Sequence, residues 1–370
     1  MAIDTIGTNA ITNDAVTSAK IPAGAVVASD VADGSVTTAK LADNAVTSAK
    51  ALNLGRRNLI INGSMTNWQR GTSFSSNVYG CDRWKFYAPG SHANTRSTDT
   101  PDSPNNFKYS NSCGGSGDAT GITQFIESGN CVHVPTSGST KVILSFYLKH
   151  TTNSGTAKIT SVVGTMDVAD TSGATTNRST QNHNTTTSWA RYTHEMTGAD
   201  LTAAATNGLQ VTIKHNGSGA TLFLVTAVQL EIAEAATDYE RQFAKDELED
   251  CQRYFIKSGD LGTADEWYPG VATYSGAGRI TAQCLNDNED RAPVHVKFPS
   301  YMRGAPTIVY YPGRAALTQT AGSIAVYNGN TAVTTSGKPL GRANGLQGYF
   351  QGTSTDSAAY VFQFTADAEL

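Results

Sequence analysis

The sequence has 370 residues, of which 39% are hydrophobic and only 16% are charged, and its formal net charge is −4. This charge gives no electrostatic attraction to nucleic acid or to an anionic membrane, and no apolar run approaches the ~18 residues of a membrane span. We therefore expect no nucleic-acid partner, no membrane insertion and no secretion signal. The 35 glycines and the abundant Ser, Thr and Asn favour strands and turns over helices.

The N-terminal segment carries an internal repeat. Between residues 6 and 46 an apolar side chain stands at every fifth position, at Ile6, Ile11, Val16, Ile21, Val26, Val31, Val36, Leu41 and Val46. A period of five fits neither a strand nor a single helix face, so each unit must turn within itself. The longer unit is ten residues, visible when 16–21 is aligned with 36–41, and turn-forming Asn, Asp, Gly and Pro lie between copies.

A single chain cannot stabilise this repeat. Nine apolar side chains contribute at most about 14–27 kcal/mol, at about 1.5–3 each. Ordering the backbone costs about 1–2 kcal/mol for every residue of the segment, and this total is larger. Partner chains must supply the remaining contacts. We predict a parallel homotrimeric stalk over residues 1–54, with a flexible linker as the alternative.

Residues 55–237 are predicted to form a β-sandwich of the jelly-roll type. Asn58 to Met65 is a candidate first strand ending in an Asn-Gly turn, and residues 112–118 and 170–187 are candidate loops. Alternating or continuous apolar residues indicate further strands at 122–127, 141–149, 157–163, 190–196, 209–214 and 221–232. The first strand and the segment 229–231 would pair to close the sandwich.

Residues 238–257 are predicted to be a helix that joins two domains. Asp238 can cap it, and its apolar stripe consists of Phe243, Leu248, Cys251 and Phe255. This stripe would pack on its own sandwich or on copies from other chains.

The last domain, residues 258–370, is predicted to be a second β-sandwich. Its strand candidates are 294–298, 307–311, 323–327, 346–351 and 360–364. The fold class is therefore all-β: a repeat stalk, then two β-sandwich domains joined by one helix, in a trimer.

Four segments carry a resemblance to a known group. Residues 68–72, 79–87, 228–232 and 248–255 resemble bacteriophage tail-fibre and receptor-binding proteins, whose central domain looks like a carbohydrate-binding-module jelly roll. The resemblance implies a protein assembled in the host cytoplasm and located in the virion tail. Its N-terminus would bind a tail or baseplate protein, and its globular domains a host surface glycan.

The cysteines and acidic residues give no sign of a catalytic or metal site. Cys81, Cys113, Cys131, Cys251 and Cys284 show no metal spacing, so we predict reduced, packed thiols, with a Cys113–Cys131 bridge as the alternative. The scattered carboxylates Asp82, Glu127, Glu195 and Glu231 form no recognisable catalytic pair, and the cluster 287–290 lacks the spacing of a calcium loop. We predict no enzyme, no catalytic residue and no cofactor.

The resemblance also bears on a structural metal. Carbohydrate-binding modules often hold calcium near positions that match Glu231 and the Asn62-Gly63 turn. This sequence has Ser64 where those modules commonly place an acidic residue. We therefore predict no metal ion.

Sugar recognition needs exposed aromatic rings beside polar groups. The distal domain offers six candidate ligand-binding residues, which stand near Gly, Ser and Asn: Trp267, Tyr268, Tyr274, Tyr301, Tyr327 and Tyr349. Trp68 and Trp84 are expected in the core instead. The predicted function is a non-enzymatic phage tail fibre that attaches the virion to host polysaccharide. The alternatives are a structural collar, whisker or capsid-decorating fibre without a receptor role, and a polysaccharide depolymerase.

Overall fold

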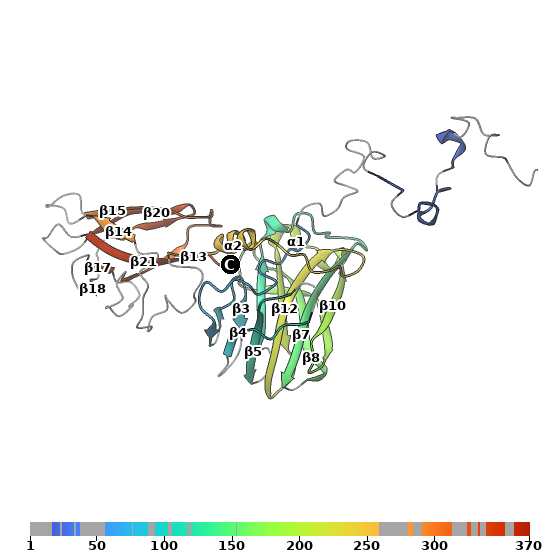
Figure 1. Ribbon diagram of the computed structural model, residues 1–370, viewed down its shortest axis with the longest axis horizontal. Helices are drawn as coiled ribbons and strands as arrows, with labels where there is room; N and C mark the ends of the chain where they lie inside the picture. Colours follow the sequence, from blue (N-terminus) through green and yellow to red (C-terminus); the bar gives the residue numbers. More distant parts are fainter. Residues whose placement is uncertain are drawn as a thin grey trace, which may run out of the picture. The chain divides into compact units, whose positions relative to one another are not determined.

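The computed structural model describes fifteen stretches of the chain: residues 17–22, 24–32, 35–37, 56–75, 77–87, 93–102, 106–116, 120–152, 154–258, 280–283, 291–312, 324–326, 332–333, 338–351 and 359–370. The chain separates into two compact units, Met1–Arg56 and Arg57–Leu370 (Figure 1). Each unit is described below by itself.

The described part of the first unit consists of short turns. The backbone amides of Lys20, Ala25, Asp30 and Ser35 each donate to the carbonyl three residues earlier, at 2.9–3.0 Å, so one turn recurs every five residues. Two of the turns form 3-10 helices, η1 (Ser18–Lys20) and η2 (Ala28–Asp30), ten residues apart. The five-residue spacing of the turns equals the period of the apolar residues, and the ten-residue spacing of the two helices equals the longer repeat unit.

The apolar residues of this repeat do not bury one another within one chain. The four that the structure describes, Ile21, Val26, Val31 and Val36, are between 40 and 58% exposed. The other five predicted stalk residues lie outside the described residues: Ile6, Ile11, Val16, Leu41 and Val46.

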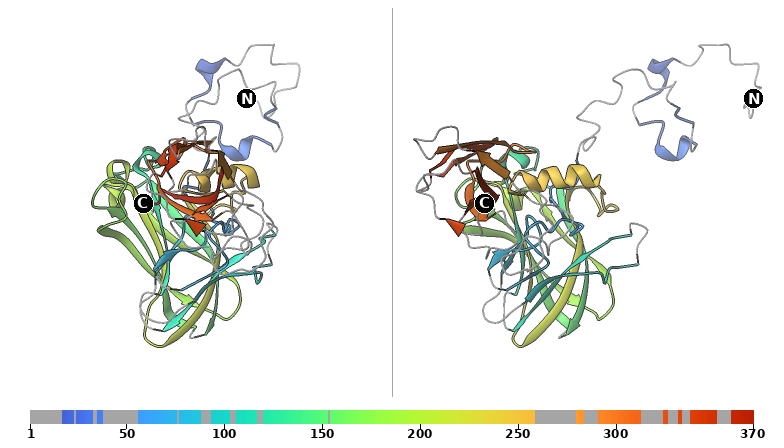
Figure 2. Two further views of the ribbon diagram at one scale, coloured as in Figure 1. Left: turned by 90° about the vertical axis from the view of Figure 1, so that its left-hand side faces the viewer. Right: turned by 60° about the vertical axis from the view of Figure 1, so that its left-hand side comes forward.

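The second unit begins with a sandwich of two antiparallel sheets. Among the described residues, sheet A has the strand order β1-β4-β5-β12-β7-β10 and sheet B the order β2-β3-β6-β11-β8-β9. Figures 1 and 2 show their long green and yellow strands running side by side in two layers. The strands are β1 (Ser73–Phe74), β2 (Val78–Tyr79), β3 (Lys85–Tyr87), β4 (Ala93–Ser97), β5 (Ser110–Ser116), β6 (Gly121–Ile126), β7 (Lys141–Thr152), β8 (Gly155–Met166), β9 (Thr175–Thr185), β10 (Ala190–Thr197), β11 (Leu209–His215) and β12 (Ala220–Ile232).

The core of this sandwich lies between the two sheets. Strand β11 shows how the sequence builds it: Leu209, Val211 and Ile213 are fully buried, while the residues between them face outward. Trp84, Phe86, Phe146 and Phe223 are also fully buried, and Trp68 is nearly so. The prediction that both tryptophans belong to the core is confirmed. So is the all-β fold class, and all six strands predicted between 122 and 232 are present.

Three local predictions for this domain are wrong. Residues 112–118 and 170–187 were expected to be loops, yet strands β5 and β9 occupy most of them. Strand β9 reads Thr-Thr-Asn-Arg-Ser-Thr-Gln-Asn-His-Asn-Thr and lies at the edge of sheet B, so most of its side chains meet solvent and no apolar alternation marks it.

The third error concerns residues 58–65, which form a bend and turn instead of a strand. Asn62 has a φ of 55°, and its side-chain oxygen accepts hydrogen bonds from the amides of Thr66 and Asn67. The segment still closes the sandwich through single backbone bonds, from Leu59 N to Leu230 O at 2.9 Å and from Val228 N to Gly63 O at 3.0 Å.

The connecting helix is shorter than predicted. Helix α2 spans Ala244–Gln252, and Asp238 does not cap it, because Glu240 N donates to Gln229 Oε1 at 2.8 Å and holds the preceding segment extended. Phe243 is the N-cap residue and is 83% exposed, and Leu248 is half-buried. Cys251 packs against Ile61 and Tyr254, and Phe255 has left the helix for the next strand. No helix in the described stretches is long and apolar enough to cross a membrane.

The distal domain again packs two sheets face to face. The described strands are β13 (Phe255–Lys257), β14 (Ile280–Gln283), β15 (Arg291–Lys297), β16 (Thr307–Pro312), β17 (Ile324–Val326), β18 (Ala332–Val333), β19 (Leu340–Arg342), β20 (Gly345–Gln351) and β21 (Ala359–Asp367). Strand β21 pairs with β13, β14, β16 and β17, and β20 pairs with β15 and β19. Tyr310, Phe350, Phe362 and Phe364 form the aromatic centre of the core between these sheets.

Buried thiols and imidazoles complete the central sandwich. Cys81, Cys113, Cys131 and Cys251 are free and buried, so no Cys113–Cys131 bridge forms, and Cys284 lies outside the described residues. Four histidines, His150, His183, His194 and His215, are also buried.

The hydrogen bonds of these imidazoles go to hydroxyl groups. Ser161 Oγ lies 2.7 Å from His183 Nε2 and 2.9 Å from His194 Nδ1. His150 contacts the hydroxyls of Thr185 and Thr221, each at 2.8 Å. Burial lowers the pKa of His150, His183 and His194 to about 4.

Candidate functional site

The outer face of sheet B presents polar side chains along its central strands. On β11 the residues between the buried Leu209, Val211 and Ile213 are Gln210, Thr212 and Lys214. The antiparallel register sets Thr212 opposite Thr123 of β6, and Gln210 opposite Phe125. A row of outward-facing hydroxyl, amide and amino groups therefore runs over the middle of the sheet.

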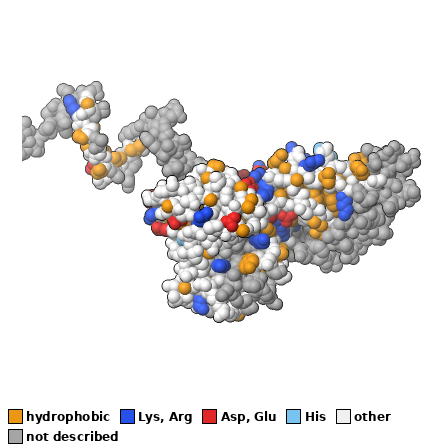
Figure 3. Space-filling model, turned by 180° about the vertical axis from the view of Figure 1, so that it is seen from behind, with side chains coloured by type: hydrophobic (Ala, Val, Ile, Leu, Met, Phe, Trp, Pro, Cys, Tyr) orange, Lys and Arg blue, Asp and Glu red, His pale blue; other side chains and the backbone are white. Residues whose placement is uncertain are grey.

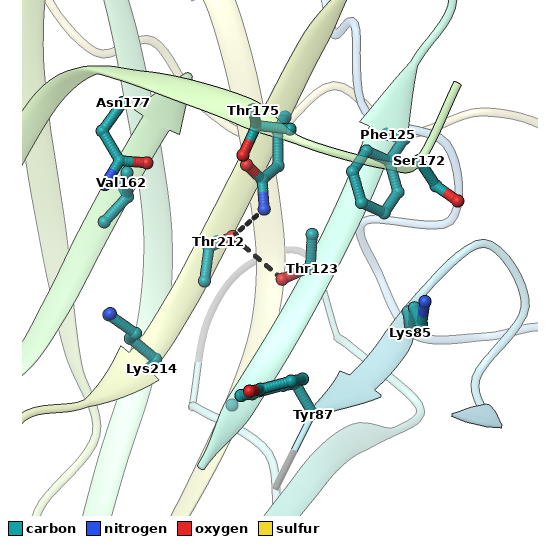
Figure 4. Close-up of a pocket in the computed structure, with 12 residues that line it drawn as sticks. Lys85, Tyr87, Thr123, Phe125, Val162, Ser172, Thr175, Asn177, Thr212 and Lys214 are labelled. Carbon is teal, nitrogen blue, oxygen red and sulfur yellow. Dashed lines mark hydrogen bonds between the residues drawn. The ribbon is translucent and has the colours of Figure 1, made fainter. Parts of the chain in front are cut away.

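A pocket of about 290 Å³ lies over this row (Figure 4). Strands β3, β6, β8, β9 and β11 supply most of its lining, and Ser172 of the turn before β9 completes it. The site is therefore assembled from segments between residues 85 and 214, and the strands of one sheet hold it in place. Side chains on strands are positioned more rigidly than those on loops.

The floor of the pocket is a short hydrogen-bonded chain. Gln210 Nε2 donates to Thr212 Oγ1 at 3.2 Å, and Thr212 Oγ1 lies 2.9 Å from Thr123 Oγ1. Gln210 Oε1 is buried and accepts no hydrogen bond from the described residues. A buried amide oxygen without a donor is costly, so a rotation of the Gln210 amide that let a ligand hydroxyl donate to it would recover that free energy.

Tyr87 supplies an aromatic ring at one side of the pocket. It is 49% exposed, and Gly121 lies directly opposite it on β6. Lys214 lies opposite Gly121 on the other side. A Cβ on Gly121 would meet Ile213 O at 2.3 Å and Lys214 Cα at 2.6 Å, so glycine allows β6 and β11 to pair closely between Tyr87 and Lys214.

The tail that follows β21 packs against Phe125, one of the residues that line the pocket. Leu370 is buried against Phe125 and Met166, and its carbonyl accepts a hydrogen bond from Tyr79 Oη at 3.0 Å. Arg83 donates to Phe125 O at 2.6 Å. The phenyl ring that lines the pocket is therefore fixed from behind by the tail of the distal domain.

Two arginines hold this tail against the sandwich. Arg83 is fully buried, forms an ion pair with Glu369 and lies with its guanidinium 3.3 Å from the centre of the Tyr254 ring. Arg70 Nη2 lies 3.2 Å from both Asp367 and Glu369, and the Arg70 guanidinium stacks on Phe255 at 3.8 Å. Burial raises the pKa of the neighbouring Asp82 to about 6, against the opposing effect of Arg70.

A second pocket, of about 320 Å³, lies at the start of helix α2. Its lining includes Arg241, the exposed Phe243 and Glu247. Ser64 Oγ donates to Glu247 Oε1 at 3.1 Å. This pocket thus contains one acidic and one basic side chain.

Two of the six aromatic residues predicted to bind a ligand belong to the described residues, and both lie away from this pocket. Tyr301, 70% exposed, precedes β16, and Tyr349, 40% exposed, lies on β20. Neither lines the pocket on sheet B. Trp267, Tyr268, Tyr274 and Tyr327 lie outside the described residues, so their predicted role stays a prediction.

The carboxylates considered as catalytic candidates all have structural partners. Asp82 accepts from the amide of Gln69 at 3.1 Å, Glu127 pairs with Arg253 at 2.7 Å, and Glu195 pairs with Lys141 at 3.1 Å. Glu231 is fully buried and accepts from the amide and hydroxyl of Thr237. The cluster 287–290 lies outside the described residues.

No group of three or more His, Cys, Asp or Glu side chains in the described stretches is arranged to hold a metal ion.

The pocket on sheet B was not predicted from the sequence. The inward residues of β11 identified the strand, and the same alternation places Gln210, Thr212 and Lys214 on one outer face. The sequence did not show which strands lie beside β11 in the sheet, because β3, β6 and β8 are far from β11 along the chain.

No protein-family model matches this sequence, and no curated protein matches it. Solved structures with local similarity include the enzymatically active domain of tailspike protein 4 of bacteriophage CBA120, at 14% identity and a TM-score of 0.29. That match covers 48% of this chain and 21% of the tailspike chain.

Two xylan-binding structures from Paenibacillus barcinonensis Xyn10C are similar as well. The CBM22-1 domain is 16% identical over 45% of this chain and 94% of its own, with a TM-score of 0.28. The CBM22-1–CBM22-2 tandem is 10% identical over 86% of this chain and 92% of its own, with a TM-score of 0.31. These identities and scores assign this chain to no family and identify no ligand for it.

Proposed function

We propose that this chain is a non-enzymatic bacteriophage fibre protein that attaches the virion to a host surface polysaccharide through the pocket on sheet B. The observation that carries the proposal is the pocket itself, where an exposed tyrosine ring lies beside a chain of hydroxyl groups and a buried amide oxygen without a donor. An aromatic ring packs on the apolar face of a sugar, and the polar groups exchange hydrogen bonds with its hydroxyls.

The Tyr87 ring gives the most direct test. Because Tyr87 is half exposed, Tyr87→Ala should leave folding intact and should lower binding of the full chain to susceptible host cells about tenfold or more. Tyr301→Ala, which removes a ring that is 70% exposed and lies outside the pocket, is the control. Equal loss in both variants would favour the distal domain as the binding surface. Unchanged cell binding in both would place the binding surface elsewhere, and a wild-type chain that does not bind susceptible cells would favour a collar, whisker or decorating fibre without a receptor role.

The absence of enzymatic activity is part of the proposal and needs its own measurement. We expect no reducing ends to be released when the full chain is incubated with capsular polysaccharide from susceptible cells. Release that persists after Tyr87→Ala but disappears on mutation of a carboxylate would identify a depolymerase instead.

The N-terminal unit is proposed to form a homotrimeric stalk that binds a tail or baseplate protein of the virion. Its turns recur every five residues, and the described apolar side chains beside them are exposed in one chain, so copies of the same segment can cover them. Three binding domains on one fibre would turn individually weak sugar contacts into firm attachment.

Light scattering tests the stalk. The full chain is expected at three times its mass of 39.0 kDa, and a chain beginning at Arg57 is expected close to the monomer. A truncated chain that stays trimeric would show that the trimer contacts lie in the β domains. A monomeric full chain would indicate that the repeat is a flexible linker.

A further inference from the structure

The pocket on sheet B has an unusual charge composition. Among the described residues that line it, only Lys85 and Lys214 are charged, and none is an aspartate or a glutamate. Neither lysine forms an ion pair with any residue that the structure describes; Lys85 Nζ is 6.0 Å from the centre of the Tyr79 ring. The described lining therefore carries a formal charge of two positive units with no acidic side chain to compensate it.

The two amino groups flank the hydrogen-bonded floor. Lys85 lies opposite Thr123 in the register of β3 and β6, and Lys214 follows Thr212 on β11 by two residues. Figure 4 shows the two lysine side chains on opposite sides of the Thr123–Thr212 pair. From ordinary strand spacings, their Cα atoms are about 12 Å apart. Such a separation suits two charges along an extended ligand better than a single small anion.

The rest of the molecule does not share this charge. The net charge of the chain is −4, and the face in Figure 3 shows acidic and basic side chains interspersed among wide polar areas. The pocket at α2 balances Arg241 with Glu247. A neutral polymer would remove water from the two charged amino groups without offsetting the free energy of their desolvation. A carboxylate offsets it, because it forms charge-assisted hydrogen bonds with an amino group.

We propose that the ligand of this pocket is an acidic polysaccharide, whose sugar carboxylates bind Lys85 and Lys214 while a ring of the same chain packs on Tyr87. This inference rests on the proposed glycan-binding function and adds the chemical class of the glycan. An acidic capsule or exopolysaccharide has the required composition; a neutral glucan or xylan does not.

The experiment compares each acidic polysaccharide with its own carboxyl-reduced form. The full chain is applied to an array of uronic-acid-containing bacterial capsular polysaccharides, polygalacturonate and alginate, each printed in native and carboxyl-reduced form. We expect reduction to lower the affinity for the recognised polymer about tenfold or more, and added salt to weaken binding to the native form only.

The lysine variants assign the effect to this pocket. Lys85→Gln and Lys214→Gln are each expected to lower affinity for the native polymer about three- to tenfold and to leave affinity for the reduced polymer unchanged. Lys245→Gln is the control, because Lys245 is exposed on α2 and pairs with Glu249 at 3.4 Å, away from the pocket.

The outcomes separate this inference from the function on which it rests. Equal binding of native and reduced polymers, or unchanged binding by both lysine variants, with a loss in Tyr87→Ala, would overturn the acidic ligand and keep the glycan site. Wild-type binding by Tyr87→Ala and by both lysine variants, or no binding to any polymer on the array, would overturn both.

Discussion

Lowering the pH from 7 to 4 is expected to reduce the free energy of unfolding of this protein by several kcal/mol. The cause is the set of buried imidazoles in the central sandwich. Burial lowers the pKa of His150, His183 and His194 to about 4, with smaller contributions from His215 and Lys158 at His150 and from His183 at His194. An unfolded chain would bind these protons near pH 6.5.

The sign follows from that difference. Since the folded pKa lies below the unfolded one, the histidines contribute their full stability above pH 6.5 and lose it as the pH falls to about 4. Each contributes about 2–3 kcal/mol over this window. Asp82 acts in the opposite direction, because burial raises its pKa to about 6 and the folded state therefore binds its proton first. The net loss should be smaller than the sum of the three histidines.

Urea denaturation of the full chain at pH 7, 6, 5 and 4 measures this effect. His194→Gln keeps an amide that can hydrogen-bond to Ser161 and Ser179 but cannot titrate. We expect the pH dependence of its unfolding free energy to be smaller than that of the wild type by about 2 kcal/mol. His133→Gln is the control, because His133 is exposed. An identical pH dependence in wild type and His194→Gln would show that the imidazoles are not responsible.

The strands that the sequence predicted are those with a buried face. Val211 and Ile213 on β11 alternate with residues that face outward, as in a half-buried strand, and Phe362 and Phe364 on β21 are two residues apart in the core. Strand β9 was not predicted because Thr, Asn and Ser are common both in exposed edge strands and in loops. The helix was predicted too long because Phe255 continues the apolar spacing of α2 although it belongs to β13.

The site could not be predicted because its parts have ordinary local sequences. Tyr87, Gln210 and Lys214 each look like a solvent-facing residue of a strand, and only the order of strands in sheet B brings them together. Aromatic residues near Gly and Ser in the distal domain gave a stronger local signal. The same limit applies to Arg83 and Glu369, which pair across 286 residues of chain.

Removing the Arg83 guanidinium is expected to cost about 3–5 kcal/mol of unfolding free energy in Arg83→Met. Arg83 is 1% exposed and pairs with Glu369, which is 5% exposed, so the substitution leaves a buried carboxylate. Arg70 stays within 3.2 Å of Glu369 and should hold the loss near the lower end of this range. Met fills a similar volume. The change in unfolding free energy therefore measures the loss of the charge and of the guanidinium hydrogen bonds, not the cost of a cavity.

Two further variants identify the cause. Lys141→Met breaks an ion pair with Glu195 in which the side chains are 39% and 57% exposed, and it should cost at most about 1 kcal/mol. The double variant Arg83→Met with Glu369→Gln should recover part of the loss, because it no longer buries an uncompensated charge. Urea denaturation measures the unfolding free energy of the two single variants and of the double variant. If Arg83→Met were as stable as the wild type, the tail would not depend on Arg83. Because Arg83 also binds the carbonyl of Phe125, a destabilised tail should weaken polysaccharide binding in the same variant.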